Sequence, residues 1–582
     1  MSIARIRWVS GPVLRARAEG PFHLREAVQV GANALLGEVI RLNGDEILVQ
    51  VYEDTTGLRL GAQVAGTGAP LNVRLGPGLL GNIFDGLLRP LAHAASPYIQ
   101  PGLRTAQPGV FAFAPLLQAG MRVASGQAFG KVAPEHGRSQ LCLVPPGIDG
   151  EVIGIAAAGR YPEHRPLCTL RGSDGNDREF AMSHAWPVRV PRPVAARLPA
   201  QELLHTGQRI IDSMFPLARG GKAAIPGGFG TGKTILLESL ARWCDADIIV
   251  YVGCGERGNE IAGVLEEFPQ LMDPRSGRAL MERTVIIANT SNMPVSAREA
   301  SIYTAITVAE YFRDQGLHVA LMADSISRWA EALREISGRL GELPGEGGFP
   351  AYLSSRLAEF FERAARVRTL AGTEGSVTVM AAVSPPSGDF SEPVVSHSRR
   401  FVRNFWALDT RRAQARFYPA INPLVSYSED APELAHWWHQ QGNTRWSELR
   451  QRFLLLIEQQ AKLERMARII GKDALPMRQQ LTLLCAELVN EAFLRQSAFS
   501  AVDHFASPQR QTAMMRVLGR FIELAEQAVA QGHPPESLTR LDIFRKLQRM
   551  GEDIAEGQPD LFRQLAEDLE QAFARMQASH ET

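Results

Sequence analysis

The sequence predicts a multidomain protein: a central α/β domain with a mostly parallel sheet follows β-rich N-terminal segments and precedes a C-terminal helical bundle. The chain has 582 residues, which is too long for a single hydrophobic core. Strand and helix patterns alternate over residues 205–428, as they do in parallel sheets that are covered on both faces. Residues 429–582 carry apolar residues at helical spacing.

The composition excludes several classes of protein. Lys plus Arg and Asp plus Glu both total 62, so the formal net charge of +0 argues against nucleic acid as the main partner. The five cysteines form no C-x-x-C pair, so neither a disulfide framework nor a zinc site is expected. Residues 1–20 lack the apolar stretch of a signal peptide, and no apolar run is long enough to cross a membrane. We expect a cytoplasmic or membrane-peripheral protein.

Residues 1–75 are predicted to form a β-barrel. Asn43-Gly44 lies between two apolar stretches, which is a strong hairpin signal, and more short apolar runs separated by glycines follow. A β-sandwich is the alternative and would leave the functional argument unchanged. Residues 76–99 connect this domain to the core.

Residues 100–187 predict a separate β-rich insertion, because they combine many Gly and Pro residues with short β-like runs. Its histidines, His136, His164 and His184, are scattered and do not predict a metal site. Residues 186–193 contain three prolines and indicate a stiff, extended return segment.

The central domain, residues 188–428, contains the strongest motif. The expected strands are residues 222–226, 247–252, 284–288, 318–323 and 376–383, with helices at 259–268, 297–315 and 327–339. The first strand leads into a phosphate-binding loop of the form G-x-x-x-x-G-K-T, and a helix follows it. The loop consists of Gly227, Gly228, Phe229, Gly230, Thr231, Gly232, Lys233 and Thr234. This pattern predicts an α/β RecA-like core that binds nucleotide at the carboxyl ends of its strands.

The chemistry of the loop follows from its residue types. Glycines let several backbone N–H groups point at one anion, and the helix adds its positive N-terminal end. Lys233 can reach the outer phosphates, and the Thr234 hydroxyl can bind Mg²⁺.

Charged residues stand at the ends of two further predicted strands. Asp324 ends an apolar strand, where a carboxylate can hold the Mg²⁺ that bridges the β- and γ-phosphates. Glu256 follows the strand after the loop helix and could orient and polarise the attacking water; a structural ion pair with Arg257 is the alternative. Arg257 could steady Glu256 or contact phosphate.

Two aromatic residues are candidates for stacking on an adenine ring, Phe417 and Phe499, although either could instead belong to a core. The C-terminal region, residues 429–582, is predicted to be a helical bundle with helices at 446–470, 480–498, 510–531 and 559–576. Its charge-rich end, residues 545–581, predicts a solvated face, with a partner-binding face as the alternative.

Together these motifs resemble the catalytic A subunit of the rotary V/A-type ATPases over nearly the full length. The segments that carry the resemblance are residues 51–55 (VYEDT), 186–189 (WPVR), 206–209 (TGQR), 253–260 (GCGERGNE), 322–325 (MADS), 327–332 (SRWAEA) and 389–393 (DFSEP). The insertion between barrel and core separates this family from the F-type and export ATPases, and this chain has one.

The resemblance implies an activity and an assembly. It implies ATP hydrolysis or synthesis with ATP/ADP and Mg²⁺, Glu256 as the catalytic glutamate, and Phe417 and Phe499 in the adenine pocket. It implies a hexameric ring of three A and three B subunits around a central shaft that the helical bundle faces, with a peripheral stalk. The ring would be cytoplasmic and peripheral to a membrane sector that conducts protons or sodium ions.

The sequence departs from the family pattern at a few positions. Gly228 stands where Pro is usual, Ser387 where Gly is usual, and Arg399 lies in an unusually basic segment. The catalytic carboxylates, Lys233 and Thr234 remain, which indicates a divergent branch with a working site.

Two other functions fit part of the pattern. A non-catalytic nucleotide-binding partner in the same ring would be expected to lack Glu256 or the Lys233-Thr234 pair, and this chain has both. A RecA-like DNA recombinase or helicase is disfavoured by the zero net charge and by the barrel with its insertion; DNA-stimulated turnover would support it.

Overall fold

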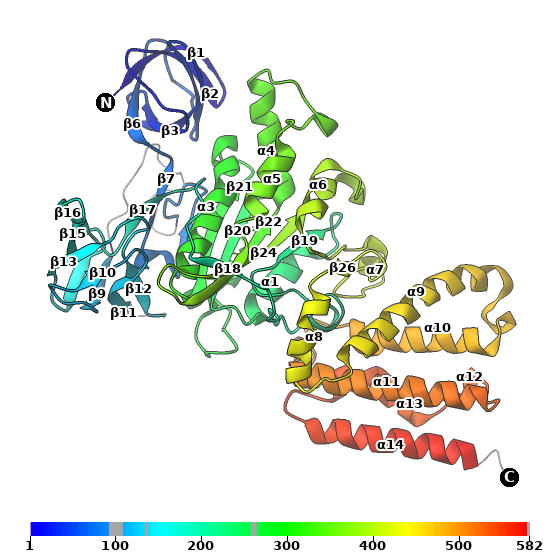
Figure 1. Cartoon of the computed structure of the whole chain (residues 1–582). Helices are drawn as coiled ribbons and strands as arrows, with labels where there is room; N and C mark the ends of the chain where they lie inside the picture. The colour runs from blue at the N-terminus through cyan, green and yellow to red at the C-terminus, as the bar shows by residue number, and fades with distance from the viewer. Residues whose placement is uncertain (1, 92–108, 134–137, 258–262, 265, 579–582) are drawn as a thin grey trace. The chain divides into compact units, whose positions relative to one another are not determined.

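A computed structural model describes residues 2–91, 109–133, 138–257, 263–264 and 266–578 of the chain (Figure 1). The chain forms two compact units. The first consists of residues 1–199, 219–222 and 246–402, and the second of residues 200–218, 223–245 and 403–582. The change between them at residues 222 and 223 falls inside one strand, β19 (Lys222–Pro226), so the phosphate-binding loop belongs to the second unit.

The N-terminal domain is a closed six-stranded barrel with strand order β1-β2-β5-β4-β3-β6, which confirms the predicted barrel over a sandwich. Its strands are β1 (Ile3–Ser10), β2 (Val13–Ala18), β3 (Glu26–Val30), β4 (Leu35–Asn43), β5 (Glu46–Val51) and β6 (Gln63–Pro70). Asn43 pairs with Glu46, so the hairpin turn is Gly44-Asp45, one residue later than the Asn-Gly signal suggests. Gly44 has a φ of 62°, which favours glycine.

The insertion contains two four-stranded antiparallel sheets, with orders β10-β13-β15-β16 and β12-β11-β9-β14. Its strands are β9 (Val110–Pro115), β10 (Arg122–Val123), β11 (Ala128–Ala133), β12 (Gln140–Leu143), β13 (Gly150–Ile155), β14 (Gly159–Pro162), β15 (Cys168–Gly172) and β16 (Asp177–Phe180). Residues such as Phe129, Val144 and Leu170 form its buried core. His136, one of the three histidines in this region, lies outside the described residues.

The segments on either side of the insertion pair with each other or join the core. β7 (Asn72–Leu75) pairs antiparallel with β17 (His184–Pro187), the start of the return segment. β8 (Ile83–Phe84), from the predicted connection, adds a parallel strand to the edge of the core sheet beside β21. The last strand of the barrel, β6, ends at Pro70, whereas the sequence predicts an N-terminal domain that extends to residue 75.

The sheet of the first unit is parallel in the order β24-β22-β20-β21-β8, as the alternating pattern predicts. Its strands are β20 (Ile248–Glu256), β21 (Thr284–Thr290), β22 (His318–Asp324) and β24 (Glu374–Val383), with β23 (Ala365–Arg368) and β18 (Ala196–Leu198) antiparallel beside β24. Its helices are α3 (Val295–Arg313), α4 (Ile326–Arg339), α5 (Leu353–Phe361) and α6 (Pro393–Phe401). The predicted helix at 259–268 lies partly outside the described residues.

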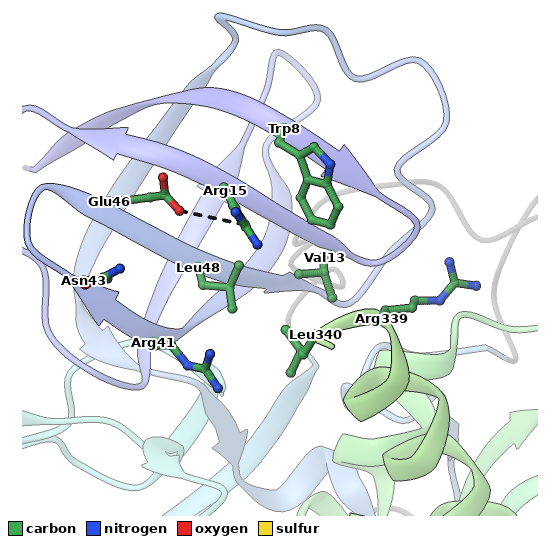
Figure 2. Close-up of a pocket in the computed structure, with 9 residues that line it drawn as sticks. All are labelled: Trp8, Val13, Arg15, Arg41, Asn43, Glu46, Leu48, Arg339 and Leu340. Carbon is green, nitrogen blue, oxygen red and sulfur yellow. Dashed lines mark ion pairs between the residues drawn. The ribbon is translucent and has the colours of Figure 1, made fainter. Parts of the chain in front are cut away.

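A small cavity of about 130 Å³ separates the barrel from the C-terminal end of α4 (Figure 2). Three arginines line it: Arg15, Arg41 and Arg339. Each has a carboxylate partner, Glu46 at 3.8 Å, Glu342 at 3.2 Å and Glu335 at 2.8 Å, respectively. The positive charges of these three arginines are therefore balanced by carboxylates, and the cavity has no excess positive charge with which to bind an anion.

The second unit begins with strands and continues into helices. β19 pairs parallel with β25 (Asn404–Phe405), which pairs antiparallel with β26 (Tyr427–Ser428). Its helices are α1 (Lys233–Trp243), α7 (Thr410–Gln414), α8 (Ala431–Gln440), α9 (Trp446–Ile470), α10 (Met477–Val489), α11 (Pro508–Ala530), α12 (Pro535–Thr539), α13 (Asp542–Asp553) and α14 (Pro559–Ala578). Residues 446–576 thus form the predicted helical bundle. In the part of the chain that the structure describes, no helix is long and apolar enough to cross a membrane.

Candidate functional site

The phosphate-binding loop is folded onto itself between β19 and α1. Gly230 and Gly232 have φ values of 75° and 83°, in the left-handed region that favours glycine. The Thr231 hydroxyl donates to the Gly228 carbonyl at 2.8 Å. Lys233 Nζ donates to the carbonyls of Gly227 and Gly228 at 2.7 and 2.8 Å. These bonds hold the loop in a curl at the start of α1.

The loop and the start of α1 have the backbone geometry that attracts anions. Gly232 is the N-cap of α1, which is 11 residues long, and no side-chain hydrogen bond caps this end of the helix. The first backbone N–H groups of a helix lack intrahelical partners and attract negative charge. Thr234 is half-buried in this first turn, and the Phe229 side chain is 83% exposed.

A cavity of about 730 Å³ begins at this loop and lies within the second unit. Thr231, Gly232 and Ile235 line it beside the loop, and Tyr418 and Phe499 contribute aromatic rings. Its size suits a nucleotide-sized ligand. Phe417 is not among the lining residues; its ring lies under the Arg412 guanidinium, with 3.9 Å between the guanidinium carbon and the ring centroid. The structure thus points to Tyr418, which the sequence analysis missed, as the partner of Phe499 in this cavity.

We expect Tyr418→Ala and Phe499→Ala each to weaken binding of MgATP about tenfold, because stacking of a base on an aromatic ring contributes about 1–3 kcal/mol. Phe417→Ala is the matched comparison, since its ring faces Arg412. Titration of a fluorescent adenine nucleotide measures all three. Weakening by Phe417→Ala alone would show that the adenine ring stacks on Phe417 instead.

In the first unit, two carboxylates stand at the carboxyl ends of neighbouring strands. Asp324 is the last residue of β22 and is 3% exposed; its Oδ2 accepts a hydrogen bond from the Tyr251 hydroxyl at 3.2 Å. Glu256 is the last residue of β20 and half-buried, so this strand runs four residues further than predicted. β20 and β22 are paired up to Gly253 and Asp324. Arg257 follows Glu256 and is exposed.

A bulge precedes Glu256. In the register of β20 with β21, Cys254 pairs with Asn289 and Glu256 with Thr290, so Gly255 is an extra residue. Gly255 has a φ of 73°. Bulges bend a strand and re-aim the next side chain, and they are frequent beside active sites.

The residues proposed for Mg²⁺ fit that ion by their chemistry. Thr234 offers a hydroxyl and Asp324 a carboxylate, and Mg²⁺ prefers oxygen ligands. The described residues contain no group of three or more His, Cys, Asp or Glu side chains that could hold a metal.

Each of the three departures from the family pattern has a defined structural setting. Ser387 has a φ of 54° in the turn after β24, a conformation that costs an L-residue about 1 kcal/mol and that glycine adopts freely. Arg399 lies exposed in the last turn of α6, where positive charge interacts favourably with the helix dipole. Gly228 supplies the carbonyl that Lys233 and Thr231 bind.

Comparison with known proteins decides the family. Residues 207–428 match the model of the "ATP synthase alpha/beta family, nucleotide-binding domain", and residues 435–538 match the "C-terminal domain of V and A type ATP synthase". Residues 6–68 and 106–189 match the β-barrel and barrel-sandwich domains of the alpha/beta subunits. The chain is 49% identical over 556 residues to the A subunit of the A-type ATP synthase of Thermococcus sp. (strain KI), covering 94% of this chain and 95% of the relative. The chain belongs to the ATP synthase alpha/beta family.

A second relative extends the match within this family. The V-type ATP synthase alpha chain of Halothermothrix orenii is 47% identical over 578 residues, which cover 98% of each protein. The chain is therefore similar over nearly its whole length to A subunits and alpha chains of A/V-type ATP synthases, and it has the ATP-hydrolysing and ATP-synthesising activity of this family and its use of ATP, ADP and Mg²⁺.

A solved structure supports the fold. The chain matches the assembled ATPase EscN of the enteropathogenic E. coli type III secretion system with a TM-score of 0.63 at 22% identity, covering 88% of this chain and 99% of EscN. At this identity the match supports the fold alone. The A-type and V-type ATP synthase relatives are the informative ones for function, because they match at more than twice this identity.

Proposed function

We propose that this chain is the catalytic A subunit of a rotary complex in which three A subunits alternate with three B subunits. A central shaft, a peripheral stalk and a membrane sector that conducts protons or sodium ions would be other subunits. The complex would place this chain in the cytoplasm, peripheral to the membrane. The observation that carries the proposal is the near full-length match to the A subunits of A-type ATP synthases, together with an intact phosphate-binding loop and Glu256.

We propose the following division of the chain. Residues 1–75 form the barrel, 76–99 the connection, 100–187 the insertion, 188–428 the nucleotide-binding domain and 429–582 the helical domain. The four matched family models support four of these parts.

In the proposed nucleotide site, different residues bind the phosphates, the Mg²⁺ ion and the adenine ring. The backbone of residues 227–234 binds phosphate oxygens, and Lys233 binds the outer phosphates. Thr234 and Asp324 would hold Mg²⁺, which supplies positive charge to the phosphates when bound. Phe499, with Tyr418 or Phe417, would stack on the adenine ring.

Glu256 is proposed to act on water. A half-buried carboxylate that ends a parallel strand stands where such sheets bind ligands. It can accept a proton from water, or orient the water by a hydrogen bond, during attack on the γ-phosphorus. Arg257 would steady this carboxylate or contact phosphate.

We expect Glu256→Gln to bind MgATP about as well as the parent chain but to lose hydrolysis by about 10²- to 10⁴-fold, since it keeps the shape and removes the base. Nucleotide titration and steady-state phosphate release in the assembled complex measure the two effects separately. Glu335→Gln, on the exposed side of α4, is the control and should change neither. Equal losses of binding and turnover in Glu256→Gln would favour the structural ion pair with Arg257.

A further inference from the structure

The strand end that carries Glu256 is held from the side by the first turn of α3. Ser291, just beyond β21, donates its backbone N–H to the Glu256 carbonyl at 2.9 Å. Arg298, on α3, donates from Nη2 to the Ser291 carbonyl at 3.0 Å. The Arg298 side chain is thus connected to the Glu256 backbone through a single residue.

The same arginine packs against the bulge. A Cβ atom added to Gly255 would lie 2.7 Å from both Cδ and Nε of Arg298, closer than real Cβ atoms approach. The left-handed backbone and this close contact both require glycine at position 255. The stem of Arg298 therefore occupies the space beside the bulge and limits how Gly255, and with it Glu256, can move.

Further bonds join the same turn of α3 to β20. The Ser301 hydroxyl lies 3.3 Å from Cys254 Sγ, and this sulfur lies 3.5 Å from the Arg298 carbonyl. Burial raises the pKa of the Cys254 thiol to about 12, so it stays a neutral, packed group at physiological pH. These contacts fix α3 against the residue before the bulge.

The next residue of α3, Glu299, holds the same turn through an ion pair. Glu299 binds Arg189 of the return segment through both carboxylate oxygens, at 2.9 and 2.7 Å. Arg189 also contacts Glu38 of the barrel at 3.3 Å and lies 4.8 Å from the Tyr303 ring. All these groups are buried or nearly so. The turn that carries Arg298 is thus held by a buried network that includes the barrel.

The hydrogen-bonding capacity of the Arg298 guanidinium is only partly used. Its side chain is 9% exposed, and its Nε has no hydrogen-bond partner among the described residues. A buried donor without a partner lowers stability, so stability alone is a weak reason for an arginine here.

We propose that Arg298 is a positioning residue for the hydrolysis step: by binding Ser291 and packing on Gly255, it sets the direction in which the bulge presents the Glu256 carboxylate. This inference rests on the proposed role of Glu256. Displacement of a reacting group by about 1 Å can cost about 10² in rate, so the geometry of this strand end matters for turnover.

The test is a double-mutant cycle in the assembled complex. Arg298→Met keeps an unbranched apolar stem beside Gly255 and removes the guanidinium. We expect it to lower kcat about 10- to 100-fold, with little change in the KM for MgATP or in Tm. In a Glu256→Gln background, the same substitution should lower the residual rate by less than about threefold, because residues that act as a unit are not additive.

Two further variants control the test. Arg298→Lys can still donate to the Ser291 carbonyl but lacks the planar fork, so we expect an intermediate kcat and a folded protein even if Arg298→Met is unstable. Arg283→Met removes another buried guanidinium, one that binds the Ala246 carbonyl and Asp273, and should lower Tm without the kinetic coupling to Glu256. A loss of kcat that is as large in the Glu256→Gln background as in the parent would overturn the inference. Full activity of Glu256→Gln alone would overturn the proposed role of Glu256, and the inference with it.

Discussion

Lys233→Ala should abolish ATP turnover, with a loss of at least about 10²- to 10³-fold, while the chain stays folded. We expect the Lys233 ammonium group to stabilise the negative oxygens that develop during phosphoryl transfer. In this structure it donates to the carbonyls of Gly227 and Gly228, so it already lies against the backbone of the loop. Steady-state phosphate release and Tm measure activity and folding.

Lys233→Ala should also lower the stability of the second unit. Two of the bonds of this half-buried side chain go from its charged ammonium to the carbonyls of Gly227 and Gly228, and a hydrogen bond of a charged group contributes about 1.5–3 kcal/mol. Lys462→Ala is the matched control: this exposed lysine of α9 binds Glu458 and should leave turnover unchanged. Normal turnover by a folded Lys233→Ala chain would remove the lysine from the mechanism.

Elements with a clear hydrophobic period could be predicted closely from sequence. The prediction of 446–470 coincides with α9, which ends where Gly471 takes a φ of 88°. β19 also has its predicted bounds, because an apolar run leads directly into the glycines of the loop. In both cases the signal that ends the element is local in the sequence.

Pairing between distant segments could not be predicted in the same way. β7 and β17 are more than a hundred residues apart in the chain, and neither carries a local signal for its partner. β8 has two residues, too few for any period, yet it extends the core sheet. Such pairings depend on long-range contacts and not on propensity.

The aromatic residues of the cavity show a similar limit. Phe417 and Tyr418 are neighbours, and a sequence motif does not decide which of two adjacent side chains faces a cavity. The structure places Tyr418 on the cavity and covers Phe417 with Arg412. The bulge at Gly255 and its contact with Arg298 also have no sequence signal, because they join residues from three separate segments.

The remaining charge for phosphoryl transfer is expected to come from a neighbouring protein in the proposed ring. The transition state spreads negative charge over three equatorial oxygens, and Lys233 with Mg²⁺ would cover the side towards the β-phosphate. Arg257 is exposed at the end of β20 next to Glu256, and we do not expect it to fill this role alone. Many phosphate-loop enzymes take an arginine from a neighbouring protein, which accelerates the reaction about 10³- to 10⁵-fold.

We therefore expect the purified chain to bind MgATP but to hydrolyse it about 10³- to 10⁵-fold more slowly than the chain assembled with its B partner, a difference in barrier of about 4–7 kcal/mol. Rotation of the shaft would open and close each interface, and movement of the partner's arginine would couple the chemistry to torque. Steady-state hydrolysis by the lone chain and after reconstitution with its B partner measures the difference, with the lone chain shown to be monomeric by light scattering. Lys233→Ala is the background control in both preparations, because it removes hydrolysis by this chain and reveals any contaminating ATPase. If the monomeric chain already turns over at the reconstituted rate, the site is complete within a single chain, and the shared-site mechanism is wrong.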